Sequence, residues 1–594
     1  MHCCSGQRRL PEAAVRTRRR ERSHPVGADS SATEPLENPI AAEAAPTDCG
    51  CSPDCAGHAR ILSTRPAAAY RLLPRGVLMS KLDLVWFKRD LRLVDHAAAS
   101  ASADARGVLG LYVFEPGYWQ APDTSARQFE FLCDSLRELE RQLIARGGSL
   151  EVHVGEVGEV LRGLHARHPL GAVRSHEESG NGWTYARDRR VALILRELGL
   201  PWHEYRQFGV VRGLQRRQGW AQQWEALIGS PSPAKEAGTR WVRGNGQLEA
   251  CIAQMRQCMT PDSCAGRQTG GRSEGLQLLD SFLSHRGLAY HRQMSSPLSA
   301  AAACSRLSAH LSLGTLSLRE IVHAVRAKRA QLRAQVQLPP ELATQPRALQ
   351  AFESRLHWHC HFMQKLETEP QIEFRNIHRG FDGMREGEFD DQRFAALCEA
   401  RTGWPFVDAC LRMLDHEGWI NFRMRAMLMA VSSYHLWLHW RQPALFLARR
   451  FVDYEPGIHY SQAQMQSGVT GINIPRIYNP IKQSQDQDPD GRFIRHWLPE
   501  LAALPATRIH APFQMSLAEQ QRHGVILDRD YPRPIVDHEQ AAREARARLT
   551  AWRRRPGMYE QSREVMDKHG SRKRRVQRAL PVPSPQPDLF GDPI

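Results

Sequence analysis

Apolar and polar positions follow two different periods along this chain. In the first half, apolar runs at residues 82–87, 108–114 and 149–155 have the length and character of buried strands. Residues 125–148 place apolar side chains at helical spacing and end in two glycines. Strands that alternate with helices predict βαβ units and a parallel, Rossmann-like α/β sheet. Neither a G-x-G-x-x-G motif nor a P-loop follows these strands, which argues against a dehydrogenase or an ATPase.

The second half has a helical period, with aromatic, arginine and carboxylate residues crowded between residues 401 and 497. Arg423, Arg425, Asp453 and Glu455 lie within this otherwise apolar sequence, which belongs in a core. Charged side chains are costly to bury unless they are paired or bound to another charged group. The pattern therefore predicts an all-helical domain that houses a large polar cofactor.

The composition favours an anionic partner. The chain of 594 residues has a formal net charge of +16 and a pI near 9.5, which favours nucleic acid first and an anionic membrane surface second. No apolar run approaches the roughly 20 residues of a membrane span, and the Arg-rich start lacks the apolar stretch of an export signal. We expect no membrane partner and a cytoplasmic, nucleoid-associated location.

Thirteen scattered cysteines lack the spacing of a disulfide framework, which fits a reducing cytoplasm. Cys251, Cys258 and Cys264 form a loose trio, but a structural metal site usually has four ligands at tighter spacing. No metal is therefore predicted.

Taken in order from about residue 80 to residue 551, these motifs resemble the cryptochrome/photolyase family, light-driven flavoproteins that repair DNA or signal. The resemblance implies an N-terminal α/β antenna domain at residues 80–212, a linker at 213–279 and an all-α FAD-binding catalytic domain at 280–555. Some members carry an iron–sulfur cluster in the catalytic domain. No cysteine follows Cys410 here, which argues against that variant.

Both ends of the chain have the composition of disordered segments. Residues 1–79 are predicted to be a disordered extension. Translation assigned from an upstream start codon is a simpler explanation of this extension than a functional role. Residues 556–594 turn basic and then proline-rich, which predicts a mobile tail.

The resemblance implies that a tyrosine and a short turn grip the FAD diphosphate. Hydroxyl groups, backbone N–H groups at a helix start and one arginine make an anion site. A Ser-Arg-Leu-Ser sequence alone is usually just a helix cap, so the order of the motifs carries this prediction. The residues are Tyr290, Cys304, Ser305, Arg306, Leu307 and Ser308.

Arg425 and Asp453 match a pair beside the flavin that can tune the electronics of the ring. Tyr454 and Glu455 follow directly and are expected to help hold the cofactor. His459 falls where a side chain, usually asparagine in photolyases, faces the flavin N5 atom. Because histidine titrates near neutral pH, His459 is predicted to gate flavin protonation, with a purely structural role as the alternative.

Trp358 falls where family photolyases place a tryptophan against the flipped pyrimidine pair, and a flat ring offsets the lost base stacking. A core tryptophan is the alternative. The resemblance directs Arg423 toward DNA phosphate. Two further DNA-facing positions depart from cyclobutane-dimer photolyases: Arg355 replaces a glutamate that bonds the lesion, and His359 replaces an arginine.

Many family members relay electrons to photoexcited flavin through three tryptophans. Trp440 matches the middle one, but Ala463 and Gly387 occupy the other two positions, so the usual triad is broken. Other aromatic residues offer a different route, although aromatics at such spacing are most often core. They are Trp404, Trp419, Tyr434, Trp437 and Tyr460.

In the family the first domain holds a light-harvesting antenna. Residues 176–190 could line its pocket, with Glu177 or Glu178 bonding a pterin-like ring; alternatively these charges solvate a helix start. Folate, deazaflavin and lumazine types all remain open for this second chromophore.

The last residues include QPDLF, which resembles the short peptide that bacterial replication and repair proteins insert into the sliding clamp. Leu589 and Phe590 are adjacent apolar anchors, and Gln586 can bond a pocket rim. A chance match in an unstructured tail is the alternative.

The resulting expectation is a photolyase-like lyase that repairs pyrimidine dimers in damaged DNA by electron transfer from light-excited reduced FAD. A cryptochrome-like sensor without repair activity is the main alternative. It is favoured by Arg355, by the broken triad and by Phe422, which replaces a lesion-contacting asparagine while Asn421 lies one residue early. A DNA-bound adaptor with vestigial light chemistry is a third.

Overall fold

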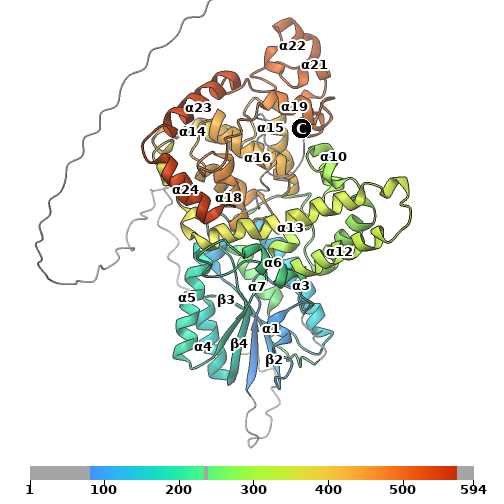
Figure 1. The fold of residues 1–594 in the computed structure, drawn as a ribbon, viewed down its shortest axis with the longest axis vertical. Helices are drawn as coiled ribbons and strands as arrows, with labels where there is room; N and C mark the ends of the chain where they lie inside the picture. Colours follow the sequence, from blue (N-terminus) through green and yellow to red (C-terminus); the bar gives the residue numbers. More distant parts are fainter. Residues whose placement is uncertain (1–80, 233–237, 571–594) are drawn as a thin grey trace, which may run out of the picture. The chain divides into compact units, whose positions relative to one another are not determined.

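The structure is a computed structural model that describes residues 81–232 and 238–570 (Figure 1). The predicted extension at 1–79 and the clamp-docking residues Gln586, Leu589 and Phe590 lie outside the described residues.

The first domain contains a five-stranded parallel sheet with the order β3-β2-β1-β4-β5. Its central strand β1 pairs with β2 and β4, so that Leu84 lies opposite Leu109 on one side and Val173 on the other. This confirms the predicted parallel α/β sheet. The strands are β1 (Leu82–Trp86), β2 (Val108–Phe114), β3 (Leu150–Val154), β4 (Leu170–His176) and β5 (Trp202–Tyr205).

Alternate residues of β1 face two separate apolar layers, because successive side chains of a strand point to opposite faces. Val85 packs in the layer that contains α3 (Ala126–Ile144) and α7 (Leu248–Gln257). Leu84 and Trp86 pack in the layer that contains α4 (Val157–Arg167) and α5 (Gly182–Glu197). Both faces are thus covered, as expected for a parallel sheet.

The second domain is helical, which confirms the rest of the predicted fold class. The other helices of both domains are α1 (Ala97–Ser100), α2 (Pro116–Trp119), α6 (Trp220–Gly229), α8 (Arg272–Ser281), α9 (Tyr290–Gln293), α10 (Pro297–Ala303), α11 (Ser308–Ser312), α12 (Leu318–Arg333), α13 (Gln345–Thr368), α14 (Asp391–Cys398), α15 (Pro405–Glu417), α16 (Phe422–Ala430), α17 (Arg441–Arg450), α18 (Pro456–Gln466), α19 (Pro480–Gln487), α20 (Arg492–Trp497), α21 (Ala506–Ile509), α22 (Leu517–His523), α23 (His538–Arg553) and α24 (Met558–His569). Two π-helical turns, Phe282–Arg286 and Val431–His435, extend α8 and α16. Short 3-10 turns occur at Pro340–Leu342, Pro370–Glu373, Arg379–Phe381, Glu386–Glu388, Pro499–Leu501 and Pro512–Gln514.

Two of the predicted segments between and after the domains contain helices. The segment assigned as a linker, 213–279, contains α6, α7 and most of α8, and α7 packs its apolar face against the sheet. The segment assigned as a disordered tail, 556–594, begins with α24, where Val565 and Met558 pack on the helical core. The predicted disorder is therefore wrong for residues 558–569, where a short amphipathic pattern lies within polar sequence.

Arg127 on α3 connects the sheet domain to the helical domain. Its wholly buried guanidinium donates to both carboxylate oxygens of Asp262 at 2.6 Å. It also donates to the backbone oxygens of Asp415 at 3.0 Å and Arg450 at 3.1 Å. A buried arginine with so many acceptors fixes the segments that meet around it.

Helices α13 and α18 approach closely because of one glycine. A Cβ atom at Gly457 would lie 2.6 Å from the Cα of Met363, closer than any side chain tolerates. This contact sets the spacing between Trp358 on α13 and His459 on α18, two of the predicted site residues. Within the described residues, no helix is both long enough and apolar enough to cross a membrane.

Candidate functional site

A cavity of about 340 Å³ lies within the helical domain, in the range of small-molecule and cofactor sites. Every residue predicted to contact flavin or DNA lines it, although these residues are spread over about 170 positions of sequence. They are Tyr290, Cys304, Ser305, Arg306, Leu307, Ser308, Arg355, Trp358, His359, Arg423, Arg425, Asp453, Tyr454, Glu455 and His459.

The predicted diphosphate turn connects α10 to α11. Arg306 adopts a left-handed backbone conformation with a φ of 61°, which is uncommon for a residue other than glycine. Arg286 holds the turn from behind, because its guanidinium donates to the backbone oxygens of Cys304 at 2.5 Å and Ser305 at 3.3 Å. Sequence reasoning missed Arg286, which no motif distinguishes from a surface arginine.

The Arg306 side chain covers an aromatic ring in the cavity wall. Its guanidinium lies 4.2 Å from the ring centre of Trp419, and its Nε donates to the side-chain oxygen of Gln268 at 3.3 Å. Burial lowers the pKa of Arg306 from a very high starting value, so the group remains a cation. A fixed cation beside backbone N–H groups suits a phosphate ligand.

The predicted pair of Arg425 and Asp453 is present. Arg425 donates to Asp453 Oδ2 at 2.8 Å, and its guanidinium also stacks 4.0 Å from the ring centre of Phe451. The second carboxylate oxygen, Asp453 Oδ1, is buried and accepts no hydrogen bond from the described residues. A buried carboxylate with one empty oxygen on a cavity wall is suited to accept from a ligand.

Glu455 is held by a residue of the sheet domain. Arg89, in the segment after β1, donates to Glu455 Oε2 at 2.7 Å and to the Ser312 hydroxyl at 2.7 Å. Burial raises the pKa of Glu455, and Arg89 opposes that shift. Arg89 was not predicted; the charged run Lys88-Arg89 directly after a buried strand was the available signal.

The wall of the cavity has further buried polar atoms that have no hydrogen-bond partner among the described residues. They are Glu455 Oε1, Asn421 Oδ1 and both polar atoms of the Gln462 side-chain amide. Such atoms are rare in native structures unless water or a ligand completes them. The ring N–H and ribityl hydroxyl groups of FAD are donors of the required kind, and the cation at Arg306 suits its diphosphate. The donor and acceptor set therefore fits FAD.

His459 differs from expectation in its protonation. Its Nε2–H donates to the backbone oxygen of Ala444 at 2.8 Å, which leaves Nδ1 as an acceptor. Burial lowers the pKa of His459 to about 4. The ring is therefore neutral at neutral pH, and the predicted titration in that range does not follow from this environment.

Trp358 contributes an aromatic face to the cavity. Its ring is stacked on Phe362 with centres 5.6 Å apart and meets His361 edge-on at 4.9 Å. Arg355, one turn earlier on α13, and His359 line the same cavity. Burial lowers the pKa of His359 to about 4, so it is not a cation at neutral pH. Arg355 and Arg423 are thus the charged candidates for phosphate contact.

Asn421 and Phe422 both line the cavity, so the one-residue offset does not remove the amide from the site. Asn421 precedes α16 and donates to the backbone oxygens of Met294 at 3.1 Å and Ser295 at 2.6 Å. Phe422 is 37% exposed and places an apolar ring in the wall.

Trp440 lies in the core behind the cavity rather than on its wall. It is fully buried, and its indole N–H donates to the Asn376 side-chain oxygen at 2.8 Å. Its ring centre lies 6.3 Å from that of Tyr460. Among the other candidates, Trp419 lines the cavity, whereas Trp404, Tyr434 and Trp437 belong to the helical core.

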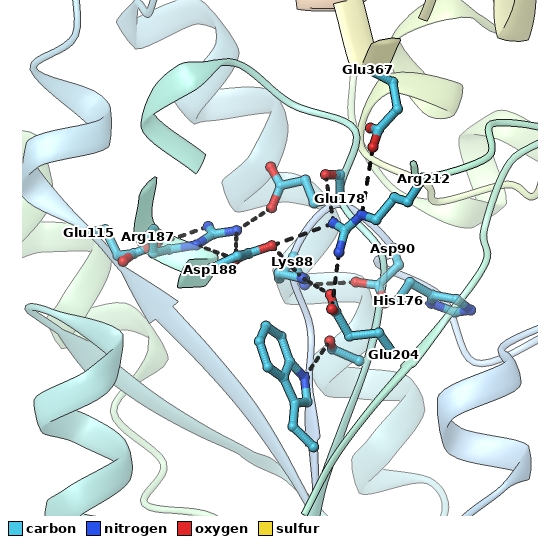
Figure 2. A network of polar contacts seen from close by, with 12 residues as sticks. Lys88, Asp90, Glu115, His176, Glu178, Arg187, Asp188, Glu204, Arg212 and Glu367 are labelled. Atoms are coloured by element: carbon cyan, nitrogen blue, oxygen red, sulfur yellow. Dashed lines mark hydrogen bonds and ion pairs between the residues drawn. The ribbon is translucent and has the colours of Figure 1, made fainter. Parts of the chain in front are cut away.

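A network of ion pairs lies in the region predicted to hold the antenna (Figure 2). Arg187 on α5 donates to Glu178 at 2.6 Å, Asp188 at 2.8 Å and Glu115 at 3.1 Å. Lys88 adds a contact of 3.4 Å to Asp188. These residues follow the carboxyl ends of β1, β2 and β4, the edge where parallel α/β sheets bind ligands.

A second arginine extends the same network. Arg212 lies 3.0 Å from Glu204 and 4.0 Å from Glu367 (Figure 2). The crevice that Glu177 and Glu178 line has a volume of only about 10 Å³, room for about one water molecule. A second chromophore would enter here only by displacing these ion pairs, so it stays a prediction.

One group of residues in the described ranges has the composition and spacing of a metal site. Asp90 Oδ2 accepts from His96 Nε2 at 3.0 Å and from His176 Nδ1 at 2.7 Å. His96 Nδ1 accepts from the backbone N–H of Ala99 at 3.1 Å. Hydrogen bonds therefore occupy these atoms, and Lys88 donates its own backbone N–H to the same carboxylate. The three cysteines of the loose trio do not form such a group there.

Comparison with known proteins identifies the family to which the chain belongs. Residues 83–211 match the family described as DNA photolyase, and residues 352–551 match the FAD-binding domain of DNA photolyase. The chain belongs to the cryptochrome/photolyase family, and its cofactor is FAD.

The similar proteins include some that are named cryptochromes and some that are named photolyases. The chain is 28% identical to a cryptochrome DASH of Gloeobacter violaceus, over 78% of this chain and 95% of that one. It is 27% identical to a deoxyribodipyrimidine photo-lyase of Agrobacterium fabrum, over 79% and 97%. The crystal structure of a bacterial class III photolyase from Agrobacterium tumefaciens aligns with a TM-score of 0.69 and 26% identity, over 81% of this chain and 99% of that one.

Proposed function

We propose that this protein repairs pyrimidine dimers in DNA, using blue light and reduced FAD bound in the cavity of the helical domain. Light-excited reduced flavin supplies the electron that splits the dimer and receives it back. The chain supplies binding, orientation and a water-poor site around that chemistry.

One observation carries this proposal: a single cavity combines unsatisfied acceptors suited to FAD with a tryptophan face and two arginines suited to a flipped pyrimidine dimer and its phosphates. Asp453 and Glu455 offer the acceptors, and Trp358 offers the ring. An aromatic platform offsets the stacking energy that a flipped base loses, and cations such as Arg355 and Arg423 suit the flanking phosphates. The net charge of +16 supports the same partner.

The test is repair of an oligonucleotide that carries one defined dimer. Purified protein with chemically reduced flavin should restore the lesion under blue light and not in the dark. Trp358→Ala should reduce repair about fivefold or more, since base–aromatic stacking is worth about 1–3 kcal/mol. Tyr559→Ala, which removes a 71% exposed aromatic ring from α24, is the matched control. If the protein repairs neither a cyclobutane dimer nor a (6-4) dimer under blue light, the proposal is refuted.

A cryptochrome-like photoreceptor is the second candidate. Arg355 in place of a lesion-binding glutamate and the apolar Phe422 on the cavity wall favour it. Flavin photochemistry that proceeds without repair of either lesion would support this function. If the protein shows neither flavin photochemistry nor repair, the remaining candidate is a DNA-bound adaptor.

We also propose that Gln586, Leu589 and Phe590 dock into the bacterial sliding clamp. The supporting feature is the QPDLF sequence behind a basic stretch that can rest on DNA phosphate. Fluorescence anisotropy of peptide 581–594 against purified clamp is the test. Micromolar binding that Leu589→Ala with Phe590→Ala abolishes supports docking, and no binding at about 100 μM refutes it.

A further inference from the structure

Two tyrosines beside the cavity share one buried carboxylate. Tyr454 donates its hydroxyl to Asp123 Oδ2 at 2.5 Å, and Tyr460 donates to the same oxygen at 3.0 Å. Asp123 is 2% exposed and comes from the sheet domain, in the segment before α3. The side-chain amide of Asn181 donates to this oxygen at 3.2 Å. No motif of the sequence predicted this group.

The tyrosine rings form a contiguous path from the cavity into the core. Tyr454 lines the cavity, and its ring centre lies 6.4 Å from that of the buried Tyr460. Tyr460 lies 6.3 Å from Trp440, which lies 5.5 Å from His439. All of these separations fall within the range of direct aromatic contact. The His439 side chain is 20% exposed, so the path reaches the surface.

Trp419, an aromatic residue on the wall of the same cavity, is a poor electron donor. The Arg306 guanidinium lies 4.2 Å from the ring centre of Trp419. A cation over a ring is attracted to its electrons and opposes formation of a second positive charge there. A tyrosine avoids this difficulty because it loses a proton together with the electron, provided that an acceptor is at hand.

Asp123 is such an acceptor. A phenol that loses an electron becomes strongly acidic, and its hydroxyl proton must move at once to a base within hydrogen-bond distance. Before oxidation both phenols keep their protons, because burial and the Asp123 charge raise the pKa of Tyr454 and Tyr460. The arrangement therefore combines a neutral donor with a base positioned to receive its proton.

We propose that Tyr454, Tyr460 and Asp123 form a proton-coupled relay that replaces the missing flavin-proximal tryptophan. The inference rests on FAD occupying the cavity. With FAD bound, Tyr454 would give one electron to the photoexcited oxidised flavin, and its hydroxyl proton would move to Asp123 Oδ2. Tyr460 then reduces the Tyr454 radical: Tyr454 recovers a proton from Asp123, and Tyr460 gives its own proton to the same oxygen.

Trp440 completes the sequence. It gives one electron to the Tyr460 radical, and Tyr460 recovers the proton from Asp123, so the carboxylate ends unprotonated. The oxidised Trp440 keeps its indole proton, because its partner is the Asn376 amide oxygen, which is not a base. An external thiol at the surface beside His439 then gives one electron to Trp440, releases its S–H proton to water and becomes a thiyl radical. In the net reaction the flavin gains one electron and the thiol loses one.

The test compares holoprotein variants under blue light with an external thiol, without oxygen. Asp123→Asn keeps the size and an acceptor oxygen but removes the base, and should slow flavin photoreduction about tenfold or more. Tyr454→Phe and Tyr460→Phe should do the same. Tyr531→Phe is the matched control, since Tyr531 is another buried tyrosine of the same core and its hydroxyl also donates to a buried carboxylate, that of Asp408. Flavin content and melting temperature are measured for each variant to identify damage to folding or binding.

A spectroscopic signature separates the relay from a merely structural role. Freeze-quenched wild-type protein should show a tyrosyl radical by electron paramagnetic resonance, with hyperfine structure that changes when ring-deuterated tyrosine is incorporated. Asp123→Asn should lose that signal while retaining flavin. Unchanged photoreduction in Asp123→Asn, or equal slowing in Tyr531→Phe, overturns the relay.

The relay and the proposed repair function fail in different experiments. With chemically reduced flavin, repair needs no relay, so Asp123→Asn should repair DNA at the wild-type rate. Loss of repair in wild-type protein with intact photoreduction refutes the repair function and leaves the relay in place.

Discussion

Asp453 offers the sharpest test of how this cavity holds its cofactor. Its Oδ2 atom is occupied by Arg425 at 2.8 Å, whereas its Oδ1 atom has no hydrogen-bond partner among the described residues. Asp453→Ala removes both oxygens, and Asp453→Asn keeps an uncharged acceptor. If Oδ1 accepts a hydrogen bond from FAD, the two variants should lose affinity in graded order.

The magnitude follows from the type of hydrogen bond. A bond to a charged group is worth about 1.5–3 kcal/mol, so Asp453→Ala should weaken FAD binding about 10- to 140-fold. Asp453→Asn should lose roughly half of that free energy, because a neutral bond is worth about 1 kcal/mol. Arg425 adds little to the loss: it is one-quarter exposed and retains the backbone oxygen of Ile420 at 2.8 Å.

The assay is fluorescence titration of apoprotein with FAD. Asp486→Ala is the matched control, because Asp486 forms an exposed pair with Lys482 at 3.0 Å in the same domain. Thermal melts of each apoprotein show whether the variants fold. A dissociation constant for Asp453→Ala within about twofold of wild type, or an equal loss in Asp486→Ala, refutes the assignment of Oδ1 to the cofactor.

Three other perturbations have distinct expected outcomes. Arg306→Ala with Ser308→Ala should purify mostly without flavin, since losing two or three hydrogen bonds costs several kcal/mol, or roughly hundreds-fold in affinity; full flavin absorbance relative to protein absorbance would contradict the diphosphate site. Arg187→Met should lower the free energy of unfolding by about 3–5 kcal/mol, because it leaves buried carboxylates without their main cation. Denaturant titration measures this free energy. Arg190→Met is the control: Arg190 forms an exposed ion pair, so its loss should lower the free energy of unfolding by at most about 1 kcal/mol. Burial lowers the pKa of His435 to about 4, so the unfolded chain binds a proton that the folded chain does not as pH falls below 6.5. Stability should therefore fall as pH falls from 6.5 toward 4, and His435→Leu should reduce that slope by up to about 1.4 kcal/mol per pH unit in chemical denaturation; an unchanged slope would show that His435 is not the group responsible.

Local patterns in the sequence were sufficient for the main elements. The apolar run at 108–114 coincides with β2, and the amphipathic stretch at 125–148 contains α3, because strand and helix periods depend on neighbouring residues. Where the local pattern was short, as in α24, it failed. The predicted cavity residues were found through motifs, each of which is a local sequence feature.

The sequence by itself determined the two-domain class, the parallel order of strands and helices, and the charged and aromatic side chains first assigned to flavin and DNA, all of which lie on the cavity wall. Only the tertiary structure decided which distant groups complete the site. Arg89 reaches Glu455 and Asp123 reaches both tyrosines across more than 300 positions of sequence. It also decided that ion pairs lie in the region predicted to hold the antenna and that His459 is neutral. The physical reason is that desolvation and ion pairing depend on which segments pack together, and no local period encodes that.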